Sequence, residues 1–204
     1  MASVVIIDYG SGNLRSVAKA FEAVASNVVV SDDSRMLENA SHIVLPGVGA
    51  FGDCMAGLSA LPGMLENLNE QVRVHRKWFL GICVGMQMLF ENGYENGIHK
   101  GLGWLGGDVI PLPKAGIKIP HMGWNNLEIK KKSELLKEVN NGDYAYFVHS
   151  YYAKPADNSV VMATAGYGVD VTAIIAQDNI FGAQFHPEKS QKTGLKILEN
   201  FVRL

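Results

Sequence analysis

The stretch WFLGICVGMQ, residues 78–87, decides the fold. Its first half, from Trp78 to Ile82, is almost entirely apolar, and its second half begins a helical pattern. A short apolar run of this kind predicts a strand buried on both faces, as in a parallel sheet. Glycines stand two positions before and two positions after Cys83, where a Cβ would collide with a sharp strand-to-helix turn or with the neighbouring strand. This layout predicts a turn that exposes the side chain of Cys83 at the end of a strand.

Strand and helix signals alternate through the rest of the first half. Apolar runs at 3–7, 28–30 and 43–45 are each followed by helical spacing or by a glycine loop. Asp32 and Asp33 are candidate caps for a helix that carries Met36 and Leu37. In the second half, short strand candidates at 104–110, 125–129, 146–149, 160–163, 173–176 and 181–185 are separated by Gly, Pro, Asn and Asp, and an apolar helical pattern at 195–202 closes the chain.

These patterns predict an α/β fold of the flavodoxin-like, doubly wound type. Short apolar strands between helices indicate a mostly parallel sheet, and the run of strand candidates after residue 104 indicates a β-rich C-terminal half. No repeat and no linker divides the sequence, so we expect one domain over residues 1–204.

The composition argues against several classes of protein. The chain has 204 residues, 48% apolar, and a net charge of -2, which gives no broad electrostatic footprint for nucleic acid or an anionic membrane. The longest apolar stretch, residues 78–90, is shorter than the roughly 20 residues of a membrane span. Asp8 comes too early for a secretory signal, and the two cysteines are far apart in sequence. We therefore expect a cytoplasmic protein in a reducing compartment, without nucleic-acid or membrane partners.

Cys83 is a candidate nucleophile. The positive end of a helix and a neighbouring histidine can both activate a thiol at such a turn. The segment alone leaves a second interpretation equally open, in which Cys83 is a small buried hydrophobic residue. Cys54 has no comparable surroundings, and we expect it to be structural.

The segment QFHPE, residues 184–188, supplies the candidate partners of the thiol. Pro187 disfavours helix for His186 and holds it extended, and residues two apart in an extended chain point to the same side. Glu188 can then orient the imidazole of His186 while the ring addresses the thiol. His186 alone would more often be a partly exposed turn histidine. Parallel strands end at one edge of a sheet, however, so Cys83 and His186 are expected at the same edge, and together they favour a functional role for His186.

The glycine-rich segment PGVGAFG, residues 46–52, is a candidate source of oxyanion donors. A thioester mechanism needs amides aimed at the developing oxyanion, and the amide of Val84, after the nucleophile, can supply one of them. The segment also matches G-x-G-x-x-G, but the next strand ends in Cys83 and not in an acidic residue, and Arg15 stands where the pattern at Gly10 needs its third glycine. We therefore expect no dinucleotide and no other cofactor.

Together, these segments resemble the class I (triad) glutamine amidotransferases, whose GxCxGxQ and HPE motifs are matched at 81–87 and 186–188. The resemblance implies the fold of that class and hydrolysis of glutamine through a thioester. The implied catalytic residues are Cys83, His186 and Glu188, the implied oxyanion residues are Val48, Gly49 and Val84, and the implied substrate-binding residues are Gln87, Glu95, His149, Ser150 and Tyr151.

Four further segments, at 8–16, 46–51, 120–125 and 147–151, are similar to the glutaminase subunits of imidazole glycerol phosphate synthase, an enzyme of histidine biosynthesis. The resemblance spans the chain from residue 4 to its end. It implies that ammonia passes to a cyclase partner, a (β/α)8 barrel in a heterodimer, which makes imidazole glycerol phosphate and an aminoimidazole carboxamide ribotide. It also implies that an amide near Val48 is turned away until the partner binds. The implied interface residues are Asn13, Arg15, Met122, Trp124 and Lys189, although Met122 and Trp124 are residue types more often found in a core.

Three alternatives remain open from the sequence. Another amidotransferase of the class would keep the triad but not segments 120–125 and 147–151. A cysteine hydrolase or peptidase would share the turn at Cys83 but need not carry Gln87 and Glu95. A nucleotide-binding module would not need the thiol. No CxxC or HExxH pattern is present, so we expect no metal site, and we interpret the lysines at 130–132 as a solvated turn.

Overall fold

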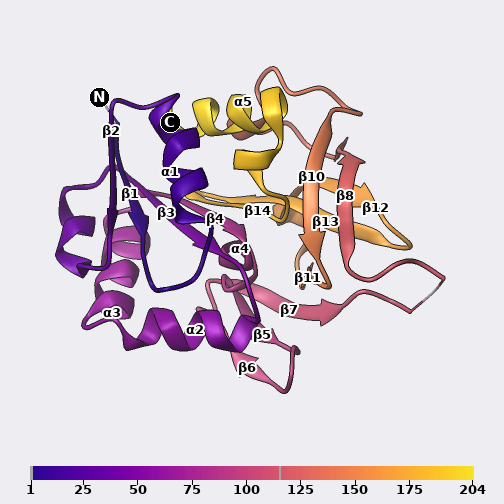
Figure 1. Cartoon of the computed structure of the whole chain (residues 1–204), viewed down its shortest axis with the longest axis horizontal. Helices are drawn as coiled ribbons and strands as arrows, with labels where there is room; N and C mark the ends of the chain where they lie inside the picture. Colours follow the sequence, from indigo (N-terminus) through magenta and orange to yellow (C-terminus); the bar gives the residue numbers. More distant parts are fainter. Residues whose placement is uncertain (1, 115) are drawn as a thin grey trace.

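A mostly parallel sheet forms the middle of the molecule (Figure 1). The computed structural model describes residues 2–114 and 116–204. Over these residues the largest sheet has eight strands in the order β2-β1-β3-β4-β14-β13-β12-β9. Its strands are β1 Ser3–Ile7, β2 Asn27–Ser31, β3 His42–Gly47, β4 Trp78–Cys83, β9 Glu128–Ile129, β12 Val161–Gly166, β13 Asp170–Gln177 and β14 Ile180–Ala183.

Strand β4 lies between β3 and β14, and all three are parallel. In the register, Gly81 is paired with Leu45 on one side and with Gly182 on the other, and Cys83 is paired with Gly47. Every residue of β3 and β14 is buried, as expected for strands covered on both faces. The carboxyl ends of β3, β4 and β14 therefore meet at one edge, as the sequence predicts.

Helices cover both faces of the sheet, which confirms the doubly wound fold. They are α1 Leu14–Glu22, α2 Phe51–Ala60, α3 Met64–Asn69, α4 Val84–Gln87 and α5 Gln191–Val202. Helices α1 and α5 lie on one side, where the rings of Phe21 and Phe201 are 6.2 Å apart, and α2 and α3 lie on the other (Figure 1). Short turns of 3-10 helix occupy Ser34–Asn39, Glu134–Leu136, Asn158–Val160 and Pro187–Lys189, and a π-helical turn occupies Glu70–Val74.

The β-rich second half extends the main sheet with β9, β12, β13 and β14, and it supplies most strands of two further sheets. Strand β8 His121–Asn126 pairs with β10 Tyr144–His149, and the order β11-β7-β5-β6 joins Tyr151–Pro155, Leu105–Pro111, Phe90–Gly93 and His99–Lys100. The single strand expected at 125–129 is wrong. Leu127 is buried and bonded to Asp143, and the chain changes sheets there, so that β8 ends before it and β9 begins after it.

Two other expectations need correction. The helix after Cys83 is only four residues long, because Phe90 and the residues after it pair with β7 instead of continuing the helix. The segment after Asp33 is 3-10 helical, although Asp33 does cap it by accepting a hydrogen bond from the amide of Arg35. Among the described residues, no helix has the length and apolar character needed to cross a membrane.

Candidate active site

The turn at Cys83 is held in a conformation that only its neighbouring glycines permit. Cys83 has φ 55° and ψ -110°, a left-handed backbone at the junction of β4 and α4. A Cβ on Gly85 would lie 1.8 Å from the carbonyl oxygen of Leu45, and a Cβ on Gly81 would lie 2.5 Å from that of Gly85. Gly85 is therefore required for α4 to pack onto β3, and Gly81 is required for α4 to fold back over β4, so the sequence prediction for both glycines is confirmed.

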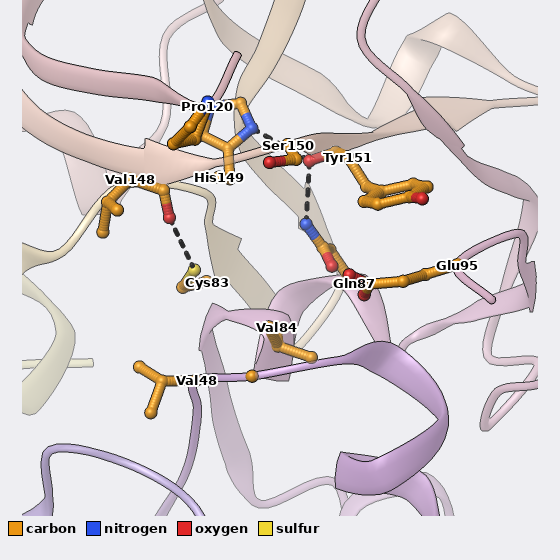
Figure 2. Close-up of a pocket in the computed structure, with 11 residues that line it drawn as sticks. Val48, Cys83, Val84, Gln87, Glu95, Pro120, Val148, His149, Ser150 and Tyr151 are labelled. Atoms are coloured by element: carbon orange, nitrogen blue, oxygen red, sulfur yellow. Dashed lines mark hydrogen bonds between the residues drawn. The ribbon is translucent and has the colours of Figure 1, made fainter.

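The sulfur of Cys83 is much less exposed than we expected. The residue is 3% exposed, because the backbone of β10 covers it. The carbonyl oxygen of Val148 lies 4.0 Å from the sulfur (Figure 2), and the side-chain amide nitrogen of Gln184 lies 3.8 Å from it. The expectation of an exposed side chain is wrong, but the sulfur does line a cavity.

His186 and Glu188 form a buried pair. Nδ1 of His186 lies 2.8 Å from Oε1 of Glu188, and the two side chains are 2% and 1% exposed. His186 is extended, with φ -99° and ψ 98°, but Glu188 belongs to the 3-10 turn Pro187–Lys189. The two side chains thus meet across a tight turn and not by strand alternation, which corrects our reason for pairing them.

The surroundings of His186 favour its charged form. Burial alone would lower the pKa of the ring, but its interactions with Cys83 and Glu188 outweigh burial and raise the pKa to about 9. Nε2, the nitrogen not bonded to Glu188, is buried and has no hydrogen-bond partner of good geometry among the described residues. That nitrogen is therefore placed to hold the proton that the thiol gives up.

A cavity of about 310 Å³ lies beside Cys83, between the loop after β3 and the strands β10 and β11 (Figure 2). It brings together residues from five segments that are far apart in the sequence. Its lining contains the predicted Val48, Gly49, Cys83, Val84, Gln87, Glu95, His149, Ser150 and Tyr151, and also Pro120 and Val148, which we did not predict.

Two polar side chains at one end of the cavity are anchored by the protein. Nε2 of Gln87 donates to the carbonyl oxygen of Tyr151 at 3.0 Å and to Oε1 of Gln184 at 3.1 Å, so both of its amide hydrogens are occupied. Oε2 of Glu95 accepts a hydrogen bond from the amide of Phe51 at 2.9 Å. A ligand can therefore use Oε1 of Gln87 and the remaining oxygen of Glu95, and a carboxylate there suits an amino group.

The backbone amide of Val48 is engaged outside the cavity. It donates to Oγ of Ser11 at 3.4 Å, while the carbonyl oxygen of Val48 accepts from Oγ of Ser11 and from Sγ of Cys54. Gly49, with φ 110°, permits the turn that follows. Cys54 is buried against this loop, and burial raises the pKa of its thiol, so it is placed as a packing residue of the loop.

Most of the residues predicted to meet a partner lie on the surface. Met122 is 62% exposed and Trp124 is 48% exposed, so neither belongs to the core. Trp124 lies against the ring of Tyr146 at 5.8 Å, and Nζ of Lys189 lies 5.9 Å from the same ring. Helix α1, where Arg15 is exposed, contacts the 3-10 turn that carries Lys189, and Asn13 is the half-buried residue that precedes this helix.

Sequence reasoning missed three residues with evident roles. Gln184 is fully buried and bonds to both Cys83 and Gln87. Its position two residues before His186 on an extended chain was a usable signal. Tyr146 connects Trp124 to Lys189, and Ser190 bonds the backbone of both Tyr146 and His186. Tyr146 carried no such signal because its partners are far away in the sequence, and the link from Ser190 to Tyr146 spans 44 residues.

Comparison with known proteins gives consistent matches. Residues 5–204 match the family described as Glutamine amidotransferase class-I. The chain is 56% identical to the imidazole glycerol phosphate synthase subunit HisH of Aquifex aeolicus, over 98% of this chain and 95% of that protein. It is 49% identical to the subunit of the same name from Rhodospirillum rubrum, over 98% of both chains.

Solved structures share the fold at lower sequence identity. A crystal structure of a glutamine amidotransferase superimposes with a TM-score of 0.76 at 18% identity, covering 99% of this chain and 100% of that one. The structure of PurLQS from Thermotoga maritima superimposes with a TM-score of 0.74 at 19% identity, covering 100% and 99%. At this identity, the likeness concerns the fold alone.

Proposed function

The chain belongs to the class I glutamine amidotransferases, and within them to the HisH subunits of imidazole glycerol phosphate synthase, and on this premise we propose how its residues release ammonia from glutamine. It is thus the glutaminase component of an enzyme of histidine biosynthesis. In the proposal, Cys83 is the nucleophile, His186 is the base and then the acid, and Glu188 orients the ring of His186.

The reaction proceeds in two halves. His186 takes the thiol proton of Cys83, and the sulfur attacks the side-chain amide carbon of glutamine. The C–N bond breaks, the proton on His186 goes to the leaving nitrogen, and ammonia departs from a γ-glutamyl thioester. Water then gives a proton to His186 and attacks the thioester, the C–S bond breaks, and the proton returns to the sulfur as glutamate is released.

One observation carries the proposal: Nδ1 of His186 is paired with the Glu188 carboxylate while Nε2 is buried and unbonded, beside a cavity that Cys83 lines and that is large enough for an amino acid. The raised pKa of His186 makes it a stronger base for the thiol proton. In the cavity, Glu95 is suited to the substrate ammonium, and Gln87, His149, Ser150 and Tyr151 form the walls around the side chain of the substrate.

Stabilisation of the oxyanion divides into a fixed part and a movable part. The amide of Val84 follows the nucleophile at the start of α4 and is the fixed donor. The amides of Val48 and Gly49 are the further donors, and that of Val48 is held by Ser11 in this structure. We infer that the loop must turn before the Val48 amide faces the cavity, and that activity without a partner is correspondingly low.

We further infer that the partner is a cyclase subunit with a (β/α)8 barrel, bound as a heterodimer. The subunit names of the relatives support a partner, and the exposed Met122 and Trp124 offer it an apolar contact. Asn13, Arg15 and Lys189 complete the proposed interface. Internal transfer keeps ammonia unprotonated and nucleophilic. A reducing, cytoplasmic location would preserve the thiols of Cys54 and Cys83, neither of which is in a disulfide.

The test compares two nitrogen sources in the complex. Cys83→Ala should abolish glutamine-dependent synthesis and leave ammonia-dependent synthesis intact, because only the former needs the thiol. Loss of both activities would assign Cys83 a structural role. A diazo-ketone analogue of glutamine should label Cys83 and be blocked by glutamine, with Cys54 as the unlabelled internal control. An adduct on Cys54, or labelling that ignores glutamine, would contradict the assignment.

A further inference from the structure

A continuous chain of hydrogen bonds joins strand β8 to the wall of the cavity. Nδ2 of Asn125 lies 3.2 Å from Nε2 of His121, and Nδ1 of His121 lies 2.9 Å from Nε2 of His149. Nδ1 of His149 lies 2.9 Å from the carbonyl oxygen of Tyr151. His121 and His149 are opposite each other in the antiparallel pair of β8 and β10. This chain of hydrogen bonds therefore crosses the two-stranded sheet of β8 and β10 and reaches the cavity.

The two ends of this chain fix the position of every proton in it. The carbonyl of Tyr151 only accepts, so Nδ1 of His149 carries the hydrogen. In a neutral ring Nε2 of His149 then accepts, so Nδ1 of His121 must donate and Nε2 of His121 must accept. Asn125 meets this requirement, because its Oδ1 accepts from the amide of Asn126, and its Nδ2 donates to both the carbonyl of Gly166 and His121.

The surroundings keep both rings neutral. The ring of His121 is stacked between those of Phe147 at 4.7 Å and Tyr167 at 3.9 Å. Burial lowers its pKa to about 4, and the ionisable groups that face it are Tyr167 and His149. Burial, and then the proximity of His121 and His186, lower the pKa of His149 to about 3. A neutral His149 places no positive charge against the proton that His186 must hold.

We propose that His121 is a positioning residue of the glutaminase site, which acts through His149 on the carbonyl of Tyr151. The same carbonyl also accepts a hydrogen bond from the side-chain amide of Gln87, so this chain of hydrogen bonds fixes the positions of Tyr151 and Gln87 in the cavity wall. Strand β8, which begins at His121, also carries the exposed Met122 and Trp124. The chain thus gives the strand that carries these residues a direct hydrogen-bonded connection to the substrate cavity.

This inference rests on the proposed function, but its first test does not depend on activity. In the wild-type protein at neutral pH, ¹⁵N chemical shifts and long-range ¹H–¹⁵N couplings should identify both His121 and His149 as neutral rings protonated at Nδ1. A ring protonated at Nε2, or a charged ring, would overturn the inference. The measurement stands even if no variant of His121 folds.

The second test measures kinetics in the complex with the cyclase. His121→Leu should lower kcat for glutamine hydrolysis about 10-fold or more, because a displaced cavity wall misaligns the substrate, and should leave ammonia-dependent synthesis unchanged. His121→Asn, whose amide nitrogen can replace Nδ1 as donor, should restore most of the loss. Tyr167→Phe is the matched control, because it keeps the stacked ring and removes only the hydroxyl bond to Lys118.

The outcomes separate the two proposals. A wild-type complex without glutaminase activity would overturn the proposed function. An active wild type with a folded His121→Leu within twofold of it would overturn the positioning role. Equal losses of kcat in His121→Leu and His121→Asn would also overturn the positioning role. They would mean that His121 acts only by packing and not through its hydrogen bond to His149.

Discussion

Glu188→Gln is the substitution that most directly probes the electrostatics of the site. It removes the charge 2.8 Å from Nδ1 of His186 with little change of shape, in a pair that is almost completely buried. The raised pKa, from the usual 6.5 to about 9, corresponds to about 3 kcal/mol of preference for the charged ring, at about 1.4 kcal/mol per pKa unit. We expect the pKa of His186 to fall in the variant, because burial then opposes only the contribution of Cys83.

The same shift predicts how stability depends on pH. A histidine whose pKa is raised on folding stabilises the protein fully below its unfolded pKa near 6.5, and this contribution disappears as the pH rises through about 9. Glu188→Gln should therefore lower the free energy of unfolding more at pH 6 than at pH 9, by a share of the preference of about 3 kcal/mol, because Cys83 also contributes to the raised pKa. It should also lower kcat for glutamine hydrolysis on the order of 10²-fold or more.

The assays are an NMR titration of His186, urea unfolding at the two pH values, and glutaminase kinetics in the complex. Glu138→Gln is the matched control, because this carboxylate is exposed and is paired with Lys196 on the surface, where we expect a change below about 0.5 kcal/mol. An unchanged His186 pKa in Glu188→Gln, or a loss of stability that grows toward pH 9, would refute the reasoning.

Two further predictions concern the loop and the turn beside the thiol. Ser11→Ala removes the hydroxyl that holds both the amide and the carbonyl of Val48, and loss of about 1 kcal/mol of hydrogen bonding should raise the partner-free glutaminase rate roughly 5-fold. Ser59→Ala, on the exposed face of α2, is the control. An unchanged or lower rate in Ser11→Ala would contradict the claim that Ser11 holds the Val48 amide away from the cavity. Gly85→Ala places a Cβ 1.8 Å from a backbone oxygen and should lower the free energy of unfolding by roughly 3 kcal/mol or more. Gly166→Ala, with open space around the added Cβ, is the control and should have little effect. A stable and active Gly85→Ala would contradict the packing described for α4.

Local patterns in the sequence predict the part of the site that depends on local geometry. The apolar run before Cys83 and its flanking glycines suffice to place a buried strand and a sharp turn, because the steric constraint lies within a few residues and one neighbouring strand. The position of His186 near Cys83 can be predicted in the same way, because His186 follows β14, which is parallel and adjacent to β4. The eight-stranded sheet and its flanking helices are likewise set by short apolar runs between helical segments.

Long-range contacts decide the remaining features, and the sequence carries little sign of them. The orientation of the Val48 peptide depends on Ser11, 37 residues away, and the burial of the Cys83 sulfur depends on Val148, 65 residues away. Strands β5, β6 and β11 were not predicted, because they are short and are defined by pairing partners more than by their own composition. The close approach of Glu188 to His186 was predicted, but a tight turn and not an extended chain produces it.

The central claim is that the sulfur of Cys83 carries the γ-glutamyl group during turnover. The most direct measurement is to quench the complex with acid during turnover of isotopically labelled glutamine and to map the label by mass spectrometry after proteolysis. We expect a base-labile glutamyl adduct on the peptide that contains Cys83. Turnover without any adduct on Cys83, or an adduct on another residue, would contradict the claim.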